Sequence, residues 1–307
     1  MGGWRGEVEV TGDPSALARR LRHGLVPAVP VPWSKAAGLD AAALAGYVRW
    51  MARQPIAGVA VGVHTGRGRH LAPADRHRVL AAWREGLPDR VIVAGAWDEA
   101  SAAEAREGGA DAVLAFPSKD DPLAYHERLS RQLPVILFYL YEAAGGVAWP
   151  LATVRELLAH PGVLGIKVAT LDSVTTFQDI AALIGEMPDK LLITGEDRFL
   201  GYSLLLGAEA ALIGMGAALP DVQAELLRSR ADRDWARFVQ LTALCDDFAR
   251  VTFRTPMEGY VRRMLWAAAA DGAIPAAACE DPWGPPLPPS ERDAVERVVR
   301  RARSALD

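Results

Sequence analysis

Short apolar segments alternate with longer amphipathic segments through the first two thirds of the chain. Eight of them are apolar at nearly every position, which is typical of strands buried on both faces of a parallel sheet. The segments between them carry helix-start signals such as Asp40, Pro73 and Asp172. Eight strand–helix repeats favour a closed (β/α)₈ TIM barrel of the α/β class over an open doubly wound sheet. The eight apolar segments span residues 25–31, 58–63, 91–94, 112–116, 135–139, 163–169, 191–194 and 210–214.

The pattern changes after residue 218, where apolar positions recur only at helical spacing. We therefore expect two parts in one chain. Residues 1–218 form the barrel with an N-terminal lead-in, and residues 219–307 form a helical extension packed on the barrel. The stretches 241–251 and 260–270 are too apolar for full exposure, which predicts a homo-oligomer.

Composition excludes several classes of protein. The net charge of −4 and the pI near 5.9 argue against nucleic-acid binding, which needs a basic surface. No apolar run approaches the roughly 20 residues of a membrane span, and the first 13 residues do not resemble a signal peptide. Two cysteines are too few for a disulfide framework, so we expect a cytoplasmic protein. The six histidines lack metal-ligand spacing, so no metal and no cofactor is predicted.

Lys167 is the candidate catalytic residue. It lies near the end of the sixth apolar segment, and reactive groups of such barrels lie at the carboxyl ends of strands. Burial lowers the pKa of an amine, and a neutral amine can attack a ketone to form an imine. The alternative is a lysine whose stem only lines the end of the strand.

Three polar side chains lie at the end of the fifth apolar segment and in the loop after it: Tyr139, Tyr141 and Glu142. Neighbouring barrel strands bring Tyr139 close to Lys167, where a phenol can move protons. Tyr139 could equally be an ordinary aromatic residue at the barrel rim. Tyr141 and Glu142 are expected to bind substrate.

A turn rich in glycine follows the second apolar segment and contains His64, Thr65, Gly66 and Arg67. A hydroxyl and backbone N–H groups at such a turn can bind a carboxylate. Arg67 can bind a carboxylate through two hydrogen bonds or can extend into solvent. These four residues are the expected binding site for an acidic substrate.

Together these segments resemble the dihydrodipicolinate synthase / N-acetylneuraminate lyase family of class I aldolases, over residues 24–303. The family's GTTGE turn resembles GVHTGRG, its YNVPxRTG segment resembles YLYEAAGG, and its GIKD(S/T) segment resembles GIKVATLDS. ITGEDRFL resembles the family's GxD segment, GAEAALIGMGAALPD its GxxGxIS segment, and MEGYVRRMLWAAAADG its C-terminal helix. Tyr139 and Lys167 are 28 residues apart, as in the family pattern.

The resemblance implies that Lys167 forms an imine with pyruvate or another 2-oxo acid, and that Tyr139 shuttles protons. It implies that Thr65 and the Gly66 N–H hold the substrate carboxylate, and it adds Leu212 to the binding residues. It also implies a homotetramer, and a 2-oxo acid and an aldehyde as partner molecules.

Several positions depart from the family pattern. His64 and Arg67 replace a threonine and the glutamate of GTTGE, Ala144 replaces the arginine of YNVPxRTG, and residues 115–119 lack the family's tyrosine pair. We therefore expect a lyase, either aldolase or dehydratase, that does not catalyse the lysine-pathway reaction itself. The alternatives are a non-catalytic paralogue that binds a small acid, and a metal-dependent barrel enzyme.

Overall fold

The computed structural model describes residues 12–306 of the chain. The first 13 residues, whose sequence does not resemble a signal peptide, lie almost entirely outside the described residues. Among residues 12–306, no helix combines the length and the apolar character that a membrane crossing requires.

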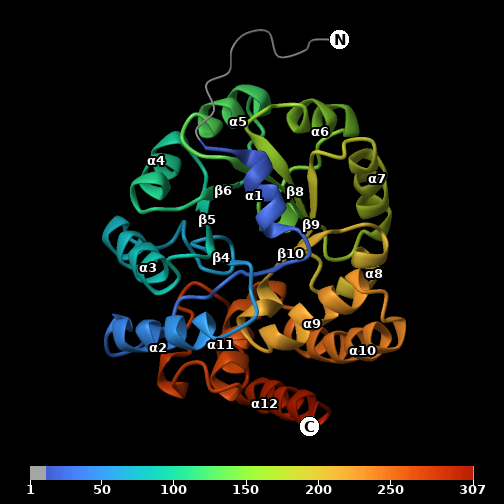
Figure 1. The fold of residues 1–307 in the computed structure, drawn as a ribbon. Helices are drawn as coiled ribbons and strands as arrows, with labels where there is room; N and C mark the ends of the chain where they lie inside the picture. Colours follow the sequence, from blue (N-terminus) through green and yellow to red (C-terminus); the bar gives the residue numbers. More distant parts are fainter. Residues whose placement is uncertain (1–11, 307) are drawn as a thin grey trace.

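Eight parallel strands form the barrel, and the predicted fold class is confirmed (Figure 1). In the sheet they follow the order β1-β10-β9-β8-β7-β6-β5-β4. The barrel closes between its edge strands, where Val29 N donates to the Ala60 carbonyl at 3.1 Å and Ala57 N donates to the Leu25 carbonyl at 2.9 Å. The strands are β1 (Leu25–Pro27), β4 (Gly58–Val61), β5 (Val91–Ala96), β6 (Ala112–Ala115), β7 (Val135–Leu140), β8 (Val163–Ala169), β9 (Leu191–Thr194) and β10 (Ala210–Ile213).

A helix follows each strand and covers the outside of the barrel (Figure 1). The start signals in the sequence act as expected at Asp40, whose carboxylate accepts from Ala43 N at 2.9 Å, and at Pro73. One helix begins later than Asp172 predicts, because the Ser173 hydroxyl caps it. The helices are α2 (Ala41–Ala52), α3 (Pro73–Gly86), α4 (Glu99–Glu107), α5 (Pro122–Ser130), α6 (Leu151–Leu158), α7 (Val174–Gly185), α8 (Leu200–Leu205) and α9 (Pro220–Ala231).

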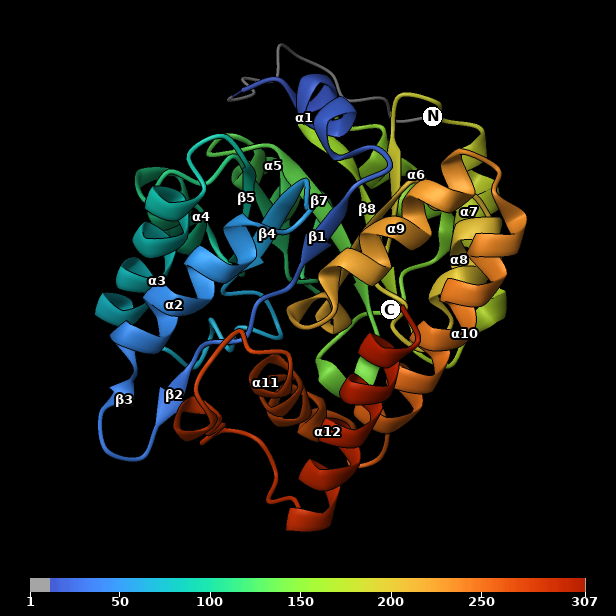
Figure 2. The same cartoon turned by 60° about the horizontal axis from the view of Figure 1, so that its bottom comes forward.

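The two ends of the barrel are covered differently (Figure 2). At one end lies α1 (Pro14–Leu21), whose Leu17, Ala18 and Leu21 side chains join the apolar interior of the barrel. At the other end lie α11 (Tyr260–Ala270), α12 (Pro289–Ser304) and the short hairpin after β1 (Figure 2). The remaining elements are β2 (Trp33–Ser34), β3 (Gly38–Leu39), η1 (Glu142–Ala144), η2 (Gly214–Ala217), α10 (Trp235–Thr252), η3 (Met257–Gly259) and η4 (Ala276–Ala278).

The apolar stretch 260–270 does not need a partner subunit to cover it. Its large side chains are buried within the chain, and α11 packs against α12 and η2. Most of the exposed large apolar side chains among the described residues lie instead on α8 and α10, which contact each other. The homo-oligomer stays a prediction, and the side chains that favour it are Tyr202, Leu205, Trp235 and Val239.

Candidate active site

Lys167 lies near the carboxyl end of β8 and is 7% exposed. It pairs in register with Phe138 of β7, and its ammonium nitrogen lies 4.2 Å from the centre of the Phe138 ring. The side chain needs the glycine at position 195, because a Cβ there would lie 2.4 Å from Lys167 Cε. The sequence thus folds Lys167 into a tight, largely apolar position inside the barrel mouth.

Two acidic residues after β9, Glu196 and Asp197, face the same region. Burial lowers the pKa of Lys167 and raises the pKa of Asp197, and the attraction between the two opposes both changes. Asp197 is held in place because Met215 N donates to its Oδ1 at 2.7 Å. Burial raises the pKa of Glu196 to about 7, although Thr170 N donates to its Oε1 at 2.6 Å. A lysine whose charged form is poorly solvated suits attack on a carbonyl.

The loop after β4 meets η3 and the first residue of α11 at the cavity that Lys167 also lines. Tyr260 Oη lies 3.0 Å from Thr65 Oγ1 and 3.4 Å from His64 Nδ1. On the other side of the imidazole, His64 Nε2 lies 3.3 Å from Glu258 Oε2. Tyr141 donates from its hydroxyl to Glu258 Oε1 at 2.9 Å. A chain of polar groups therefore runs along this wall of the site.

Arg67 does not offer its guanidinium to a substrate. It is 5% exposed, and its Nη2 donates to Asp281 Oδ2 at 2.7 Å while its Nη1 donates to Glu258 Oε2 at 3.0 Å. These carboxylates also outweigh desolvation and raise the pKa of Arg67. Arg67 thus fastens the C-terminal segment to the loop after β4, instead of taking the expected place beside a substrate carboxylate.

Lys167, His64, Thr65 and Tyr141 share one small cavity of about 30 Å³, which Tyr260 also lines. On this measure the space holds about two water molecules. A wider cleft of about 790 Å³ adjoins it, since Leu140, Tyr141 and Leu171 line both. The site therefore has a narrow inner part at the lysine and a roomy outer part.

The structure does not bring Tyr139 into the inner cavity. Tyr139 follows Phe138 on β7, so its side chain points to the opposite face of the strand. It packs with the outer, helix-covered core, and its ring centre lies 6.4 Å from that of Trp149. The pairing of Tyr139 with Lys167 that the spacing suggested is thus not found, and Phe138 occupies the place beside the lysine.

The remaining expected residues divide between the outer cleft and the barrel wall. Glu142 lines the outer cleft with Tyr139. Gly66 does not line the inner cavity, and a Cβ at this position would lie 2.9 Å from Gly62 N, so the turn itself requires the glycine. Leu212 is fully buried in the barrel interior and does not line the cavity either.

Three residues of the site were missed at the level of sequence, namely Asp197, Glu258 and Tyr260. Asp197 lies in ITGEDRFL, a segment that resembles the family but carries no local signal for the role of its aspartate. Glu258 and Tyr260 lie in MEGYVRR, whose spacing predicts only a helix. No local signal in the sequence shows that a segment 196 residues beyond His64 returns to it.

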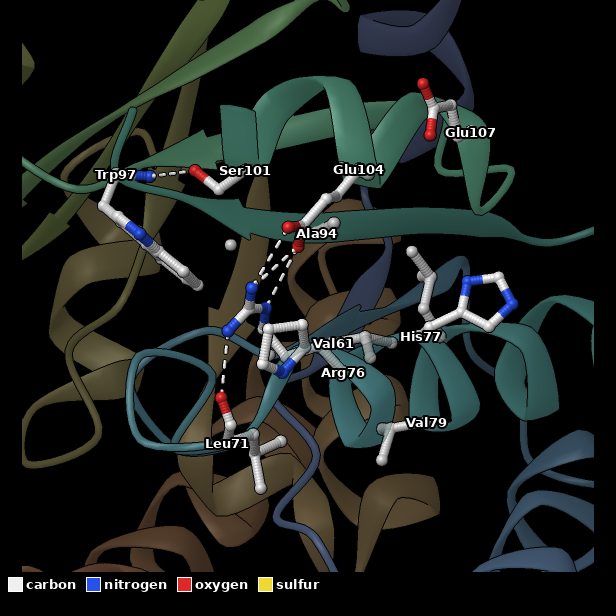
Figure 3. A pocket seen from close by; sticks show the side chains of 15 residues that line it. Val61, Leu71, Arg76, His77, Val79, Ala94, Trp97, Ser101, Glu104 and Glu107 are labelled. Atoms are coloured by element: carbon white, nitrogen blue, oxygen red, sulfur yellow. Dashed lines mark hydrogen bonds and ion pairs between the residues drawn. The ribbon is translucent and has the colours of Figure 1, made fainter. Parts of the chain in front are cut away.

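A second cavity, of about 250 Å³, lies outside the barrel between α3 and α4 (Figure 3). Its wall is mainly apolar and includes Val61, Val79 and Ala94. Two charged groups at its rim pair with each other, since Arg76 Nη2 donates to Glu104 Oε2 at 2.9 Å. Although this cavity is larger than the inner cavity at Lys167, no lysine or cysteine lines it, and the Ser101 hydroxyl that lines it donates to the Asp98 carbonyl at 2.9 Å.

Within residues 12–306, no group of three or more histidine, cysteine or acidic side chains is placed to hold a metal ion. The chemistry that this site supports without further groups is that of an amine, hydroxyls and an imidazole.

Comparisons with known proteins find relatives of one family. The sequence model of the dihydrodipicolinate synthetase family matches residues 21–302. An uncharacterized DapA-like lyase of Pyrococcus abyssi is 22% identical over 243 residues, which cover 75% of this chain and 82% of the relative. An N-acetylneuraminate lyase of Escherichia coli O1:K1 is 26% identical over 211 residues, 64% of this chain and 69% of the relative.

Solved structures show the same fold. YagE of E. coli K12, a prophage protein of the dihydrodipicolinic acid synthase family solved in complex with pyruvate, superposes with a TM-score of 0.81 at 20% identity. The match covers 91% of this chain and 98% of YagE. A dihydrodipicolinate synthase from Oceanobacillus iheyensis also gives a TM-score of 0.81, at 16% identity, and covers 95% of this chain and 100% of that protein.

Proposed function

Because the chain belongs to the dihydrodipicolinate synthetase family, we propose that it is a lyase that acts on a 2-oxo acid through an imine at Lys167. Lyases are among its relatives, which supports an enzyme of this general type. The observation that carries the proposal is the buried amine of Lys167 at the carboxyl end of β8, facing a cavity with hydroxyl and imidazole groups.

The chemistry begins with the neutral amine of Lys167. Its lone pair attacks the C2 carbonyl carbon, and one N–H proton passes from the nitrogen to the former carbonyl oxygen, which gives a neutral carbinolamine. A second proton converts the carbinolamine hydroxyl into water, which leaves as the nitrogen lone pair forms the C=N⁺ bond. The resulting iminium withdraws electrons from the bond at C3, so a C–H or C–C bond there can break.

The size of the inner cavity favours a short 2-oxo acid. Its volume of about 30 Å³ leaves little room around the reacting carbons, and the Thr65 hydroxyl that lines it can donate to a carboxylate. The pyruvate complex of the related YagE makes pyruvate the first substrate to test.

The outer cleft favours a partner larger than aspartate semialdehyde. Ala144 stands where the resemblance leads one to expect an arginine, so the loop after β7 lacks a guanidinium for a second carboxylate. Arg198 lines the cleft, but its Nη1 donates to the Phe253 carbonyl at 2.7 Å. We infer that the partner is a bulkier, less acidic or aromatic aldehyde, or that a hydroxylated 2-oxo acid simply loses water.

Borohydride trapping tests the proposal directly. The protein is incubated with pyruvate, 2-oxobutyrate or 2-oxoglutarate, reduced, and measured by intact mass. We expect the mass of one reduced acid per chain with pyruvate or 2-oxobutyrate. A folded protein that gains no mass with any of the three acids contradicts the proposal and favours a non-catalytic paralogue.

A further inference from the structure

We propose that Tyr260, His64 and Glu258 form a proton relay that removes and returns the proton at C3 of the substrate imine. This inference rests on the proposed function, because it assigns residues to a step that follows imine formation. Tyr260 is the catalytic residue that contacts the substrate, His64 is the group that takes the proton from it, and Glu258 positions the imidazole.

The hydroxyl, the imidazole and the carboxylate lie in line. Tyr260 Oη lies 3.4 Å from His64 Nδ1, and His64 Nε2 lies 3.3 Å from Glu258 Oε2. Both ring nitrogens thus have a partner, one that can give a proton and one that can stabilise the imidazolium. The arrangement follows the same logic as a hydroxyl–imidazole–carboxylate triad, in which the carboxylate fixes the orientation of the ring.

Tyr260 is held at the cavity by its neighbours. Thr65 Oγ1 lies 3.0 Å from its hydroxyl, and Phe253 stacks on its ring with a centroid distance of 4.9 Å. Tyr260 is 5% exposed and lines the same cavity as Lys167. Its hydroxyl therefore has a fixed place beside the position where the imine forms.

The inner face of β7 supplies no phenol for this step. The residues of β7 that line the inner cavity are Phe138 and Leu140, while Tyr139 packs on the outer side. Tyr141, in the loop after β7, lines the cavity but donates its hydroxyl proton to Glu258 Oε1 at 2.9 Å. The other phenol of the cavity, Tyr260 of α11, lies within hydrogen-bond distance of both Thr65 and His64. The helical extension thereby completes the active site of the barrel.

Glu258 is kept ionised and in position by several donors. Tyr141 donates to its Oε1 at 2.9 Å and Arg67 donates to its Oε2 at 3.0 Å, and Arg67 is itself fastened to Asp281. Burial tends to raise the pKa of Glu258, but hydrogen bonding and charge from His64, with the bonds from Tyr141 and Arg67, lower it to about 2. The carboxylate therefore has a fixed place beside His64 Nε2 and orients the ring with Nδ1 toward Tyr260.

The relay conserves atoms and charge. The C3–H bond breaks, its electron pair forms the C2=C3 bond, and the C=N⁺ pair returns to nitrogen to give a neutral enamine. Tyr260 Oη accepts the C3 proton as its own hydroxyl proton passes to His64 Nδ1, so the positive charge moves from the iminium to the imidazolium. The reverse transfers return the proton and restore the iminium.

Exchange of the pyruvate methyl protons with D₂O, followed by NMR, tests the relay without knowledge of the second substrate. In Tyr260→Phe, we expect exchange to slow by about 10²- to 10⁴-fold, the usual effect of losing a positioned acid–base group. The imine should still be trapped by borohydride, because Lys167 is untouched. Tyr202→Phe, at an exposed position of α8, is the matched control and should exchange as the wild type does.

The outcomes separate the two proposals. Exchange by Tyr260→Phe within about twofold of wild type, with trapping intact, overturns the relay and leaves the imine in place. Failure to trap an imine on the wild-type protein overturns both.

The second variant, Glu258→Gln, tests the positioning role by comparing proton exchange with imine trapping. The amide keeps the size of the side chain but removes the carboxylate that lies beside His64 Nε2. We expect exchange to slow by about tenfold or more, while borohydride trapping stays at the wild-type level because Lys167 is untouched. Glu258→Asp keeps a carboxylate and should recover part of the exchange rate. Exchange by Glu258→Gln within about twofold of the wild type overturns the role of Glu258.

Discussion

Two cavities of this protein differ in size and in chemistry. The cavity between α3 and α4 has about 250 Å³ and apolar walls, and its rim charges, Arg76 and Glu104, satisfy each other. The inner cavity at Lys167 has about 30 Å³, yet an amine, two phenols, an imidazole and a carboxyl group converge on it. The comparison teaches that convergence of buried polar groups, and not volume, locates the chemistry.

The position of each cavity in the barrel explains the contrast. The carboxyl ends of parallel strands meet around Lys167, so loops from several strands and the segment before α11 can each contribute a side chain. The other cavity lies between two neighbouring helices and the strands β4 and β5, so its walls come from one part of the sequence, residues 61–107. One region assembles groups from distant parts of the sequence, and the other is lined by successive elements.

Of the substitutions that test this comparison, replacement of Lys167 should have the largest effect. In Lys167→Ala, we expect no borohydride-trapped adduct with any 2-oxo acid, because no other amine lines the cavity. Lys119→Ala, at an exposed position, provides the control and should be trapped as the wild type is. An adduct on the Lys167→Ala variant would show that the imine forms on another amine of the protein.

The next largest effect should be a difference between two tyrosines, Tyr260 in the inner cavity and Tyr139 on the outer side of β7. Phenylalanine at position 260 removes the hydroxyl inside the cavity, whereas phenylalanine at position 139 removes one outside it. We expect a loss of at least about 10²-fold in methyl exchange for Tyr260→Phe and less than about twofold for Tyr139→Phe. The opposite order would mean that Tyr139 turns into the cavity and acts as the family resemblance implies.

The pH dependence of trapping should show the effect of burial on Lys167. Only the neutral amine attacks, and burial lowers its pKa from the ordinary value. The trapping rate should therefore rise about tenfold per pH unit and level off well below the ordinary lysine pKa of about 10.4. A rate that keeps rising until that pKa would show that the amine is solvated.

Filling the cavity between α3 and α4 should have the smallest effect. Ala105 is buried on α4 and lines this cavity, so Ala105→Leu adds apolar volume in a helix that tolerates leucine. We expect the free energy of unfolding to rise by about 0.5–2 kcal/mol, measured by urea denaturation, with no change in trapping. Loss of the adduct in this variant would show that the two cavities are coupled.

The barrel and its lysine were predictable from the sequence for physical reasons. A strand buried on both faces is apolar throughout, so eight such segments predict the sheet, and one lysine near the end of the sixth stands out. His64, Thr65 and Tyr141 were found because they follow strand ends, where loops meet at one edge of the barrel.

The role of Tyr139 was not predictable from spacing. Neighbouring residues of a strand face opposite sides, so either Phe138 or Tyr139 lies inside, and the choice depends on register. The pairing of β7 with β8 shifts between Val135 and Ile136, which places Phe138 beside Lys167. Such an irregularity, and the return of Glu258 and Tyr260 from the distant C-terminal segment, depend on tertiary packing that no local pattern encodes.

Location of the adduct along the chain tests the central claim most directly. The chain has four lysines, Lys35, Lys119, Lys167 and Lys190, so peptide mass mapping of the borohydride-reduced protein can identify the modified one. We predict a single reduced 2-oxo acid on Lys167. An adduct on Lys190, whose Nζ donates to the His160 carbonyl at 3.0 Å at the opposite end of β8, or on either of the other two lysines, would contradict the account.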